Sequence, residues 1–414
     1  MTEPDARRRT AAGDRHREPH GLTPFEIIAG IPHGNDRNAP ELPTPCGGSP
    51  LAAIDDAILP ALQRPPCVVS FSGGRDSSAV LAVATRLARQ HGLAPPVPVT
   101  LRFPDAPASY ESSWQERVIG FLGLREWTRI ELTDEVDYVG PVAAAVLRKH
   151  GVIWPPNTHF HRPILEMARG GSLLTGVDGD GLFGTWRYLR VMRLLRGAVT
   201  PEPRDVLRLL QAAAPPAVRK AVNNCRQAEM APWLRPEMAR AIARCWIADR
   251  SREPVTWQSR VRWFAGLRYL RLVLHSLDLM AAETDVLLVN PLVSGQFLAE
   301  LGAARKRFGY GGRTAIMAAI FGDELPADII TRRTKTHFSD AFTHRHSRSF
   351  ARTWTGRGVD DQLVDPDLLR AAWLSSEPPF LSALLLQRAW LASQEPGPEI
   401  RSDDLKRGGV GHER

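Results

Sequence analysis

The chain has 414 residues, of which 43% are hydrophobic, and it carries a formal net charge of +8 at pH 7. This length and hydrophobic content allow one large or two medium-sized cores. No stretch approaches the roughly 18 consecutive apolar residues that a membrane-spanning helix needs. The stretch from Met1 to His20 is rich in Arg, Glu and Asp and has no apolar centre, unlike a secretory signal. We therefore expect neither a membrane protein nor a secreted one.

Cysteine content and charge further narrow the classes of protein to which the chain can belong. Cys46, Cys67, Cys225 and Cys245 show no Cys-x-x-Cys spacing, so we expect neither a disulfide framework nor a zinc site, as suits the reducing cytoplasm. The positive charge is compatible with nucleic-acid binding. Arginine far exceeds lysine, however, and the basic residues are spread along the chain. We favour a generally arginine-rich composition over a nucleic-acid-binding surface.

The chain divides into four parts. Residues 1–45 are polar and Pro-rich, and we expect them to be largely disordered. Residues 46–195 show alternating strand and helix patterns and form the expected α/β core. Residues 196–393 are expected to be mainly helical, and residues 394–414 form a polar tail expected to be flexible.

Strands and helices alternate over residues 65–185, after a predicted helix at Leu51–Leu62. The predicted strands are Cys67–Phe71, Val97–Phe103, Thr128–Leu132 and Ser172–Thr175. The predicted helices are Leu51–Leu62, Ser77–Gln90, Ser112–Leu122, Val139–His150 and Ile164–Arg169. This alternation predicts an α/β fold with a Rossmann-like parallel sheet and helices on both faces.

The most informative stretch, residues 67–78, reads Cys-Val-Val-Ser-Phe-Ser-Gly-Gly-Arg-Asp-Ser-Ser. A buried strand breaks at Ser72-Gly73-Gly74, and a helix follows. The two glycines permit backbone angles that direct several N–H groups to one point, and the helix dipole also favours phosphate there. Asp76 stands at the mouth of this turn, where an acid makes physical sense if a divalent cation lies between it and the phosphates. The alternative is an ordinary turn with Ser and Asp as caps.

Other nucleotide-binding motifs are weaker. The chain has no Gly-x-x-x-x-Gly-Lys-Ser/Thr sequence, which argues against a P-loop NTPase. A Gly-x-Gly-x-x-Gly run extends from Gly179 to Gly184, which alone would indicate a dinucleotide site. It lies well inside the chain, and its second half is better explained as part of another loop.

Four stretches resemble, in order, the motifs of one family. The loop at residues 72–77 looks like the SGGxDS pyrophosphate loop of N-type ATP pyrophosphatases. Phe103 followed by Tyr110-Glu111 resembles the next segment of asparagine synthetases, and Leu174 to Trp186 is similar to their LSGxGxDELFGGY loop. The segment from residue 325 to residue 340 resembles their LPxxIxxRxKxxFSD motif, with one extra residue. Over roughly residues 50–345 the chain is identified as a member of the asparagine synthetase superfamily, which also includes β-lactam synthetases and lasso-peptide cyclases.

The resemblance implies an adenine nucleotide alpha hydrolase-like fold and adenylation chemistry with ATP and Mg²⁺. A substrate carboxylate attacks the α-phosphorus, and an amine then displaces AMP to leave an amide. The resemblance assigns Asp76 and Asp180 to the metal, with Asp180 also catalytic, and Lys335 to the charge that builds on the phosphates. Leu101 and Phe103 would face the adenine. The remaining expected nucleotide-binding residues are Ser70, Ser72, Gly73, Gly74, Ser77, Ser78 and Gly176. The alternatives are a helix cap for Asp180 and a solvated loop cation for Lys335.

Histidines are a second group of candidate site residues. His159 and His161 lie two apart, with His150 nearby, and His344 and His346 repeat the spacing. Without a Cys or carboxylate at ligand distance, we expect packing or surface histidines.

Arginines recur every three residues at Arg187, Arg190, Arg193 and Arg196. We expect a solvated helix face, and the alternative is contact with an acidic substrate. Arg75 stands where family members carry an aliphatic residue, and we expect it to point outward.

The chain departs from the family pattern where the acceptor substrate is expected. Val177 and Gly181 stand where asparagine synthetases have glutamates. Leu287, Val289 and Ser294 align with a glutamate, an arginine and an aspartate of the family. An apolar side chain cannot relay a proton or orient an ammonium group. We therefore do not expect asparagine to be made from aspartate.

The family's glutaminase domain requires a cysteine after Met1, and here position 2 is threonine. Ammonia would then come from a separate amidotransferase, or the amine would belong to the substrate. Our hypothesis is an ATP-dependent amide ligase of specialised metabolism, acting on small-molecule or peptide carboxylates and amines. The alternatives are a tRNA-modifying ATP pyrophosphatase and a catalytically silent partner protein.

Overall fold

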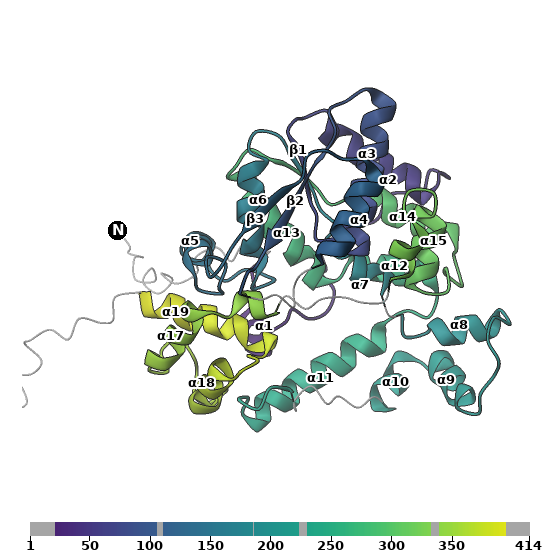
Figure 1. Ribbon diagram of the computed structural model, residues 1–414. Helices are drawn as coiled ribbons and strands as arrows, with labels where there is room; N and C mark the ends of the chain where they lie inside the picture. Colours follow the sequence, from purple (N-terminus) through teal and green to yellow (C-terminus); the bar gives the residue numbers. More distant parts are fainter. Residues whose placement is uncertain (1–20, 106–110, 185, 223–229, 333–338, 395–414) are drawn as a thin grey trace, which may run out of the picture.

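A five-stranded parallel sheet lies at the centre of the protein (Figure 1). The computed structural model describes residues 21–105, 111–184, 186–222, 230–332 and 339–394. The strands are β1 (Cys67–Ser70), β2 (Val97–Arg102), β3 (Thr128–Glu131), β4 (Ser172–Leu174) and β5 (Leu287–Val289). Their order is β3-β2-β1-β4-β5, and every neighbouring pair is parallel. The predicted Rossmann-like α/β fold is confirmed.

Both faces of the sheet are covered, because successive strand residues point to opposite sides. In β1, Val69 belongs to one hydrophobic cluster and Val68 to another, and both are buried. In β4, Leu174 and Leu173 divide in the same way. Apolar residues on both sides of each strand explain why helices are needed on both faces.

The five predicted helices are present, with ends that differ from the prediction by a few residues. They are α2 (Pro50–Leu62), α3 (Arg75–His91), α4 (Ser112–Leu122), α5 (Pro141–His150) and α6 (Arg162–Met167). Apolar residues of α2, α3 and α4 pack in the cluster that contains Val69, whereas α6 packs with Val68. Figure 1 shows α3 and α4 on one side of the strands and α5 and α6 on the other. Gly92 ends α3 in the left-handed conformation, with φ of 62°.

The rest of the chain is mainly helical, as expected, but it also supplies β5. Its helices are α7 (Gly179–Phe183), α8 (Leu189–Leu195), α9 (Arg204–Ala213), α10 (Pro216–Val222), α11 (Pro236–Arg252), α12 (Trp257–Ala265), α13 (Arg268–Ala282), α14 (Gly295–Ala304), α15 (Arg313–Phe321), α16 (Ala327–Thr331), α17 (Arg345–Thr353), α18 (Pro366–Leu374) and α19 (Ala383–Gln394). No pattern in the sequence predicted β5, because a three-residue apolar run cannot be told from a buried helix segment. No helix in the described ranges is both long and apolar enough to cross a bilayer.

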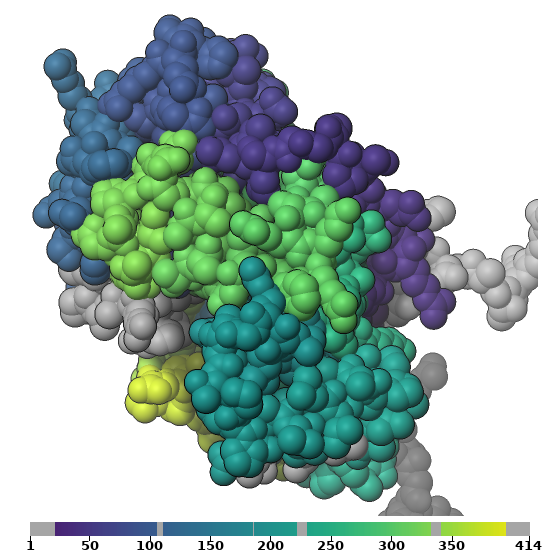
Figure 2. Space-filling model, turned by 90° about the vertical axis from the view of Figure 1, so that its right-hand side faces the viewer, coloured from purple at the N-terminus to yellow at the C-terminus, as the bar shows by residue number. Residues whose placement is uncertain are grey.

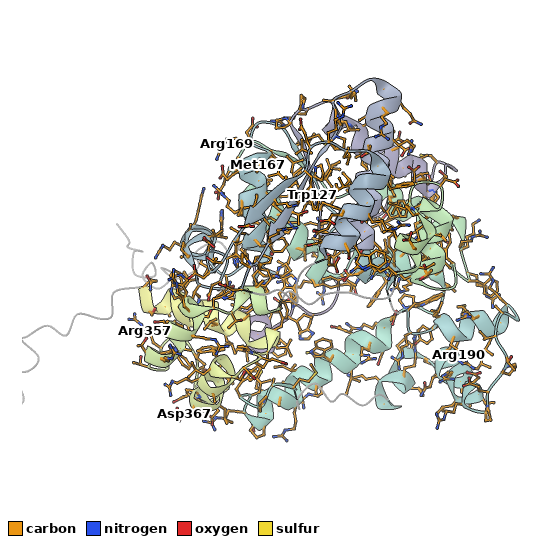
Figure 3. All side chains as sticks on the ribbon, in the orientation of Figure 1. Trp127, Met167, Arg169, Arg190, Arg357 and Asp367 are labelled. Carbon is orange, nitrogen blue, oxygen red and sulfur yellow. The ribbon has the colours of Figure 1, made fainter. Side chains whose placement is uncertain are left out.

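Helices α8 to α11 form a helical arm that lies apart from the strands in Figure 1. Figure 3 labels Arg190 on this arm. Its guanidinium binds Asp205 at 2.7 Å and Glu202 at 2.8 Å. These ion pairs join α8 to the start of α9.

Residues 21–45, where we expected little order, contain helix α1 (Pro24–Ala29). Thr23 and Glu26 form a reciprocal capping box at its start. The buried Glu26 carboxylate also accepts hydrogen bonds from Arg268 of α13, one of them at 2.9 Å. Gly30 then ends α1 with φ of 73°, and a Cβ there would overlap the backbone of Leu381. This segment is therefore packed against the helical part of the protein.

We predict that Gly30→Ala destabilises the protein by at least about 2 kcal/mol, because it adds both a strained φ and a steric overlap. Gly47→Ala is the matched control: Gly47 has φ of 80°, and nothing lies within 4 Å of the Cβ position. Strain alone should cost about 1 kcal/mol. Chemical denaturation measures both, and equal losses would show that α1 is not held against Leu381.

Candidate active site

A cavity of about 460 Å³ opens at the carboxyl ends of β1 and β4. These two strands are neighbours, with Val69 paired to Leu174, so the loops that follow them meet at one edge of the sheet. The chain leaves β1 toward β2 on one side and enters β4 on the other, which makes this edge the switch point of the strand order. Ligands of open α/β sheets bind at such points.

The loop after β1 has the geometry of an anion-binding turn. Gly73 adopts φ of 84°, and the Ser72 and Ser77 hydroxyl oxygens lie 3.1 Å apart. Gly74 is the N-cap of α3 and provides no side-chain cap. The first backbone N–H groups of α3 therefore lack acceptors within the helix and carry its positive dipole end. The turn can bind phosphate, as the sequence predicted.

Most of the residues predicted to bind nucleotide line this cavity, namely Ser70, Ser72, Gly74, Asp76, Ser77, Leu101, Phe103 and Gly176. Gly73 and Ser78 do not. The Gly73 Cα packs against Gln115, whose Cγ would lie 2.6 Å from an added Cβ. The Ser78 side chain is fully buried, because Ser78 is already in the first full turn of α3 and its N–H bonds to the Gly74 carbonyl.

The loop after β4 approaches the phosphate-binding turn at two glycines. A Cβ at Gly176 would lie 2.8 Å from the Ser77 backbone nitrogen, and one at Gly179 would lie 2.6 Å from Asp76 Cγ. Only residues without side chains allow this approach. It brings Asp180, in the first turn of α7, to the same cavity as Asp76. The two acids are close enough for Asp180 to raise the pKa of Asp76.

Burial is the main reason why the pKa of Asp76 is raised, and the guanidinium of Arg313 opposes it. Arg313 Nη2 donates to Asp76 Oδ2 at 2.6 Å. The other oxygen, Oδ1, is buried and has no hydrogen-bond partner among the described residues. Asp76 is thus a buried carboxylate that is only half satisfied.

Asp178 is a third acid in this cavity, and the sequence did not single it out. Burial, and then the charge of Asp180, raise the pKa of Asp178 to about 7. The Tyr269 hydroxyl donates a hydrogen bond to the Asp178 carboxylate, and burial raises the pKa of Tyr269 as well. Gly181 makes room for this pair, because a Cβ there would lie 2.8 Å from the Tyr269 hydroxyl oxygen.

The residues present fit a nucleotide-bound Mg²⁺. Asp76 Oδ1 and Asp178 Oδ2 are buried oxygen atoms without hydrogen-bond partners in the described part of the chain. Within the described residues no three His, Cys, Asp or Glu side chains form a metal-binding cluster. One or two carboxylates together with substrate phosphates are the usual ligands of Mg²⁺. Asp76 and Asp180 can supply the protein's share.

A buried ion pair supports the phosphate-binding turn from its other side. Arg332 donates to both Glu111 carboxylate oxygens, at 2.9 and 2.5 Å, and to the Gly73 carbonyl at 2.9 Å. Its guanidinium also lies 4.8 Å from the Trp114 ring centroid. The two charged side chains are only 3% and 4% exposed, so they act as a fixed brace. Glu111 follows Tyr110 in the motif quoted above, whereas no motif indicated Arg332.

Aromatic side chains line the opposite end of the cavity. Leu101 and Phe103 lie there with Phe160, His161 and Phe342. The His161 ring stacks on Phe160 with centroids 3.9 Å apart, and burial lowers the pKa of His161 to about 4. A neutral, aromatic wall suits a flat base such as adenine. We expected His161 to be a packing residue, and its position in this wall was not predicted.

The other candidates from the sequence have different outcomes. Lys335 is outside the described residues. None of Arg187, Arg190, Arg193 and Arg196 lines the cavity. Arg75 does not point outward as expected: it lines the cavity, with Nη1 3.3 Å from the Ile330 carbonyl oxygen.

Three residues that depart from the family pattern have structural roles. Leu287 and Val289 form β5, and Ser294 caps α14 by accepting a hydrogen bond from the Phe297 N–H. Val177 lines the cavity with an apolar surface. Among the residues that depart from the family pattern, Val177 lines the cavity, whereas Gly181, Leu287, Val289 and Ser294 do not.

The comparisons with known proteins agree with this geometry. Residues 52–391 match the family described as asparagine synthase. No curated protein matches the chain.

We predict that Glu111→Gln destabilises the protein by about 3–5 kcal/mol, because it removes the charge of a carboxylate that binds the buried Arg332 guanidinium through both of its oxygens. Glu166→Gln is the control, since Glu166 pairs with Arg162 and Arg169 on the surface with 41% of its side chain exposed. That change should cost at most about 1 kcal/mol. Urea denaturation compares them, and a loss at Glu111 as small as that at Glu166 would contradict the brace.

The raised pKa of Asp178 predicts a pH-dependent stability. The folded protein holds this proton more tightly than the unfolded chain, so the contribution is complete below about pH 4 and is lost as pH rises through about 7. Asp178→Asn cannot ionise. Without nucleotide or metal, it should therefore gain stability over wild type from pH 4 to 8, by the order of 2–4 kcal/mol. Thermal melts across this range measure the difference, with the exposed Asp56→Asn as control; a constant difference would refute a raised pKa.

Proposed function

Because the chain belongs to the asparagine synthase family, which its match over residues 52–391 shows, we propose that it is an ATP-dependent amide ligase. It activates a carboxylate as an acyl-adenylate, releases pyrophosphate and transfers the acyl group to an amine. The observation that carries this proposal is the meeting of Asp76 and Asp180 beside the phosphate-binding turn in one cavity. Asp76 is partly buried and Asp180 is exposed, and a cation between these two acids would offset the repulsion of their charges.

The residues divide the work by position. The first N–H groups of α3 would bind the β- and γ-phosphates, and Asp76 and Asp180 would hold a Mg²⁺ ion. Such an ion would neutralise charge on the phosphates. Phe103 and Phe160, which line the cavity, would pack against the adenine. Lys335 stays a predicted second cation. Positioning and charge neutralisation supply most of the rate in such reactions.

The acceptor side points away from asparagine synthesis. Val177 presents a hydrophobic surface to the cavity. Tyr269 and Asp178 fill the space that a side chain at position 181 would take. A small polar substrate such as aspartate needs charged partners there. We propose a larger or less polar carboxylate of specialised metabolism, with the amine in the same substrate or supplied by a separate amidotransferase.

One observation favours a second function. The apolar Leu287 and Val289 belong to β5 and cannot take part in proton transfer. A catalytically silent partner protein that binds ATP would keep the nucleotide half of the cavity and lose the acceptor half. Both functions require nucleotide binding, and only the ligase requires exchange.

The test measures Mg²⁺–ATP binding by calorimetry and ATP–pyrophosphate exchange with a panel of carboxylates. Wild type should bind Mg²⁺–ATP and catalyse exchange with at least one carboxylate. Asp76→Asn should lower exchange by about 10²-fold or more, because it removes a metal ligand, whereas the exposed Asp56→Asn should not. Binding without exchange would favour the silent partner. Absence of binding would refute both.

A further inference from the structure

Arg313 reaches the phosphate-binding turn from a distant helix. It is the first residue of α15, after a turn in which Gly309, Gly311 and Gly312 all have positive φ. These glycines let the chain reverse so that the Arg313 side chain enters the cavity wall. Figure 2 shows the segment from α14 to α16, in green, next to α3 and α4 in blue. Arg86 of α3 and Glu324, which follows α15, form an ion pair of 2.7 Å that joins the two segments.

The Arg313 guanidinium binds the Asp76 carboxylate, which the metal ion also requires. Nη2 lies 2.6 Å from Asp76 Oδ2, and the Asp76 side chain is 13% exposed. A metal ion at this carboxylate and a guanidinium at the same oxygen repel each other, more strongly than in water because both are partly buried. Asp76 can therefore bind the Arg313 guanidinium or a metal ion, but it binds both at the same time poorly.

The contact of Arg313 with Asp76 is weak in geometry. Only one guanidinium nitrogen reaches Asp76, whereas Arg332 binds Glu111 with two. Arg313 Nε is buried without a hydrogen-bond partner among the described residues. A planar fork with an unsatisfied N–H is better satisfied by a phosphate, which accepts two parallel bonds. The Arg313 side chain is 22% exposed, so it can move.

Neighbouring guanidinium groups favour movement of the Arg313 side chain from Asp76 toward a bound anion. Arg75 and Arg332 line the same cavity, and Arg313 is close enough to lower the pKa of Arg75, after the larger effect of burial. Like charges so close together are stabilised when a polyanion enters. Triphosphate is the polyanion that the phosphate-binding turn accepts.

We propose that Arg313 is a latch, meaning a cation that holds Asp76 in the nucleotide-free protein and moves to the ATP phosphates when they bind. This proposal rests on the proposed function. The latch compensates the charge of Asp76 before ATP binds. It also makes metal binding depend on nucleotide binding. Mg²⁺ then enters together with ATP, and the site does not collect divalent cations alone.

The latch predicts shifts of opposite sign in one variant. Arg313→Met keeps an unbranched side chain and removes the charge. It should bind Mn²⁺ without nucleotide about tenfold more tightly than wild type, because Asp76 is free, and Mg²⁺–ATP about tenfold more weakly, because a phosphate contact is lost. Electron paramagnetic resonance of free Mn²⁺ and calorimetry measure the two affinities. Loss of folding cannot raise one affinity while it lowers the other.

Two control variants locate the effect. Arg190→Met removes a guanidinium that is 32% exposed, which also pairs with carboxylates but does not line the cavity. It should change neither affinity. Asp76→Asn combined with Arg313→Met should lose the gained Mn²⁺ affinity, which places the new site at Asp76.

Each outcome decides between the proposals. Equal Mn²⁺ affinities of wild type and Arg313→Met, or an unchanged Mg²⁺–ATP affinity, would overturn the latch. If Arg313→Met does not fold, wild type decides alone: its Mn²⁺ affinity must rise at least about tenfold when a non-hydrolysable ATP analogue is added, and an equal affinity overturns the latch. Wild type that binds no Mg²⁺–ATP refutes the ligase itself, whereas wild type that binds it while Arg313→Met gains no Mn²⁺ affinity refutes only the latch.

Discussion

The close approach of two loops at the ends of β1 and β4 is the constraint on which the rest of the site depends. It is possible only because positions 176 and 179 are glycines, whose absent side chains would meet Ser77 and Asp76. The register of the two strands brings the loops side by side, and the glycines let them touch. Every other feature of the cavity follows from the resulting concentration of charge.

That charge is balanced in pairs. Asp76, Asp178 and Asp180 line the same cavity as Arg75, Arg313 and Arg332. Burial of a carboxylate is costly unless a hydrogen bond, a cation or a proton compensates for it. Here Asp76 has a guanidinium, and Asp178 has a tyrosine hydroxyl and a raised pKa. Each of these two acids still has one buried oxygen atom without a hydrogen-bond partner among the described residues, which a metal ion can use.

The sequence revealed the nucleotide half well and the rest of the cavity poorly. The turn at residues 72–78 and the loop at 174–186 carry local glycine and acid patterns, and such patterns read directly from a chain. Arg313 and Arg332 enter the cavity through tertiary packing, and no local pattern marks an arginine that will turn inward. Asp178 was visible in the loop, but its importance comes from Tyr269 of α13, far away in sequence. β5 was missed because three apolar residues carry too little periodicity.

The central claim is that Asp76 and Asp180 hold one metal ion together with one nucleotide. A double-mutant cycle on Mg²⁺–ATP affinity tests it most directly, with Asp76→Asn, Asp180→Asn and the combined variant. If both acids serve the same ion, the account predicts losses that do not add, with a coupling of at least about 1.4 kcal/mol. Losses that add, or no loss in either single variant, would contradict it.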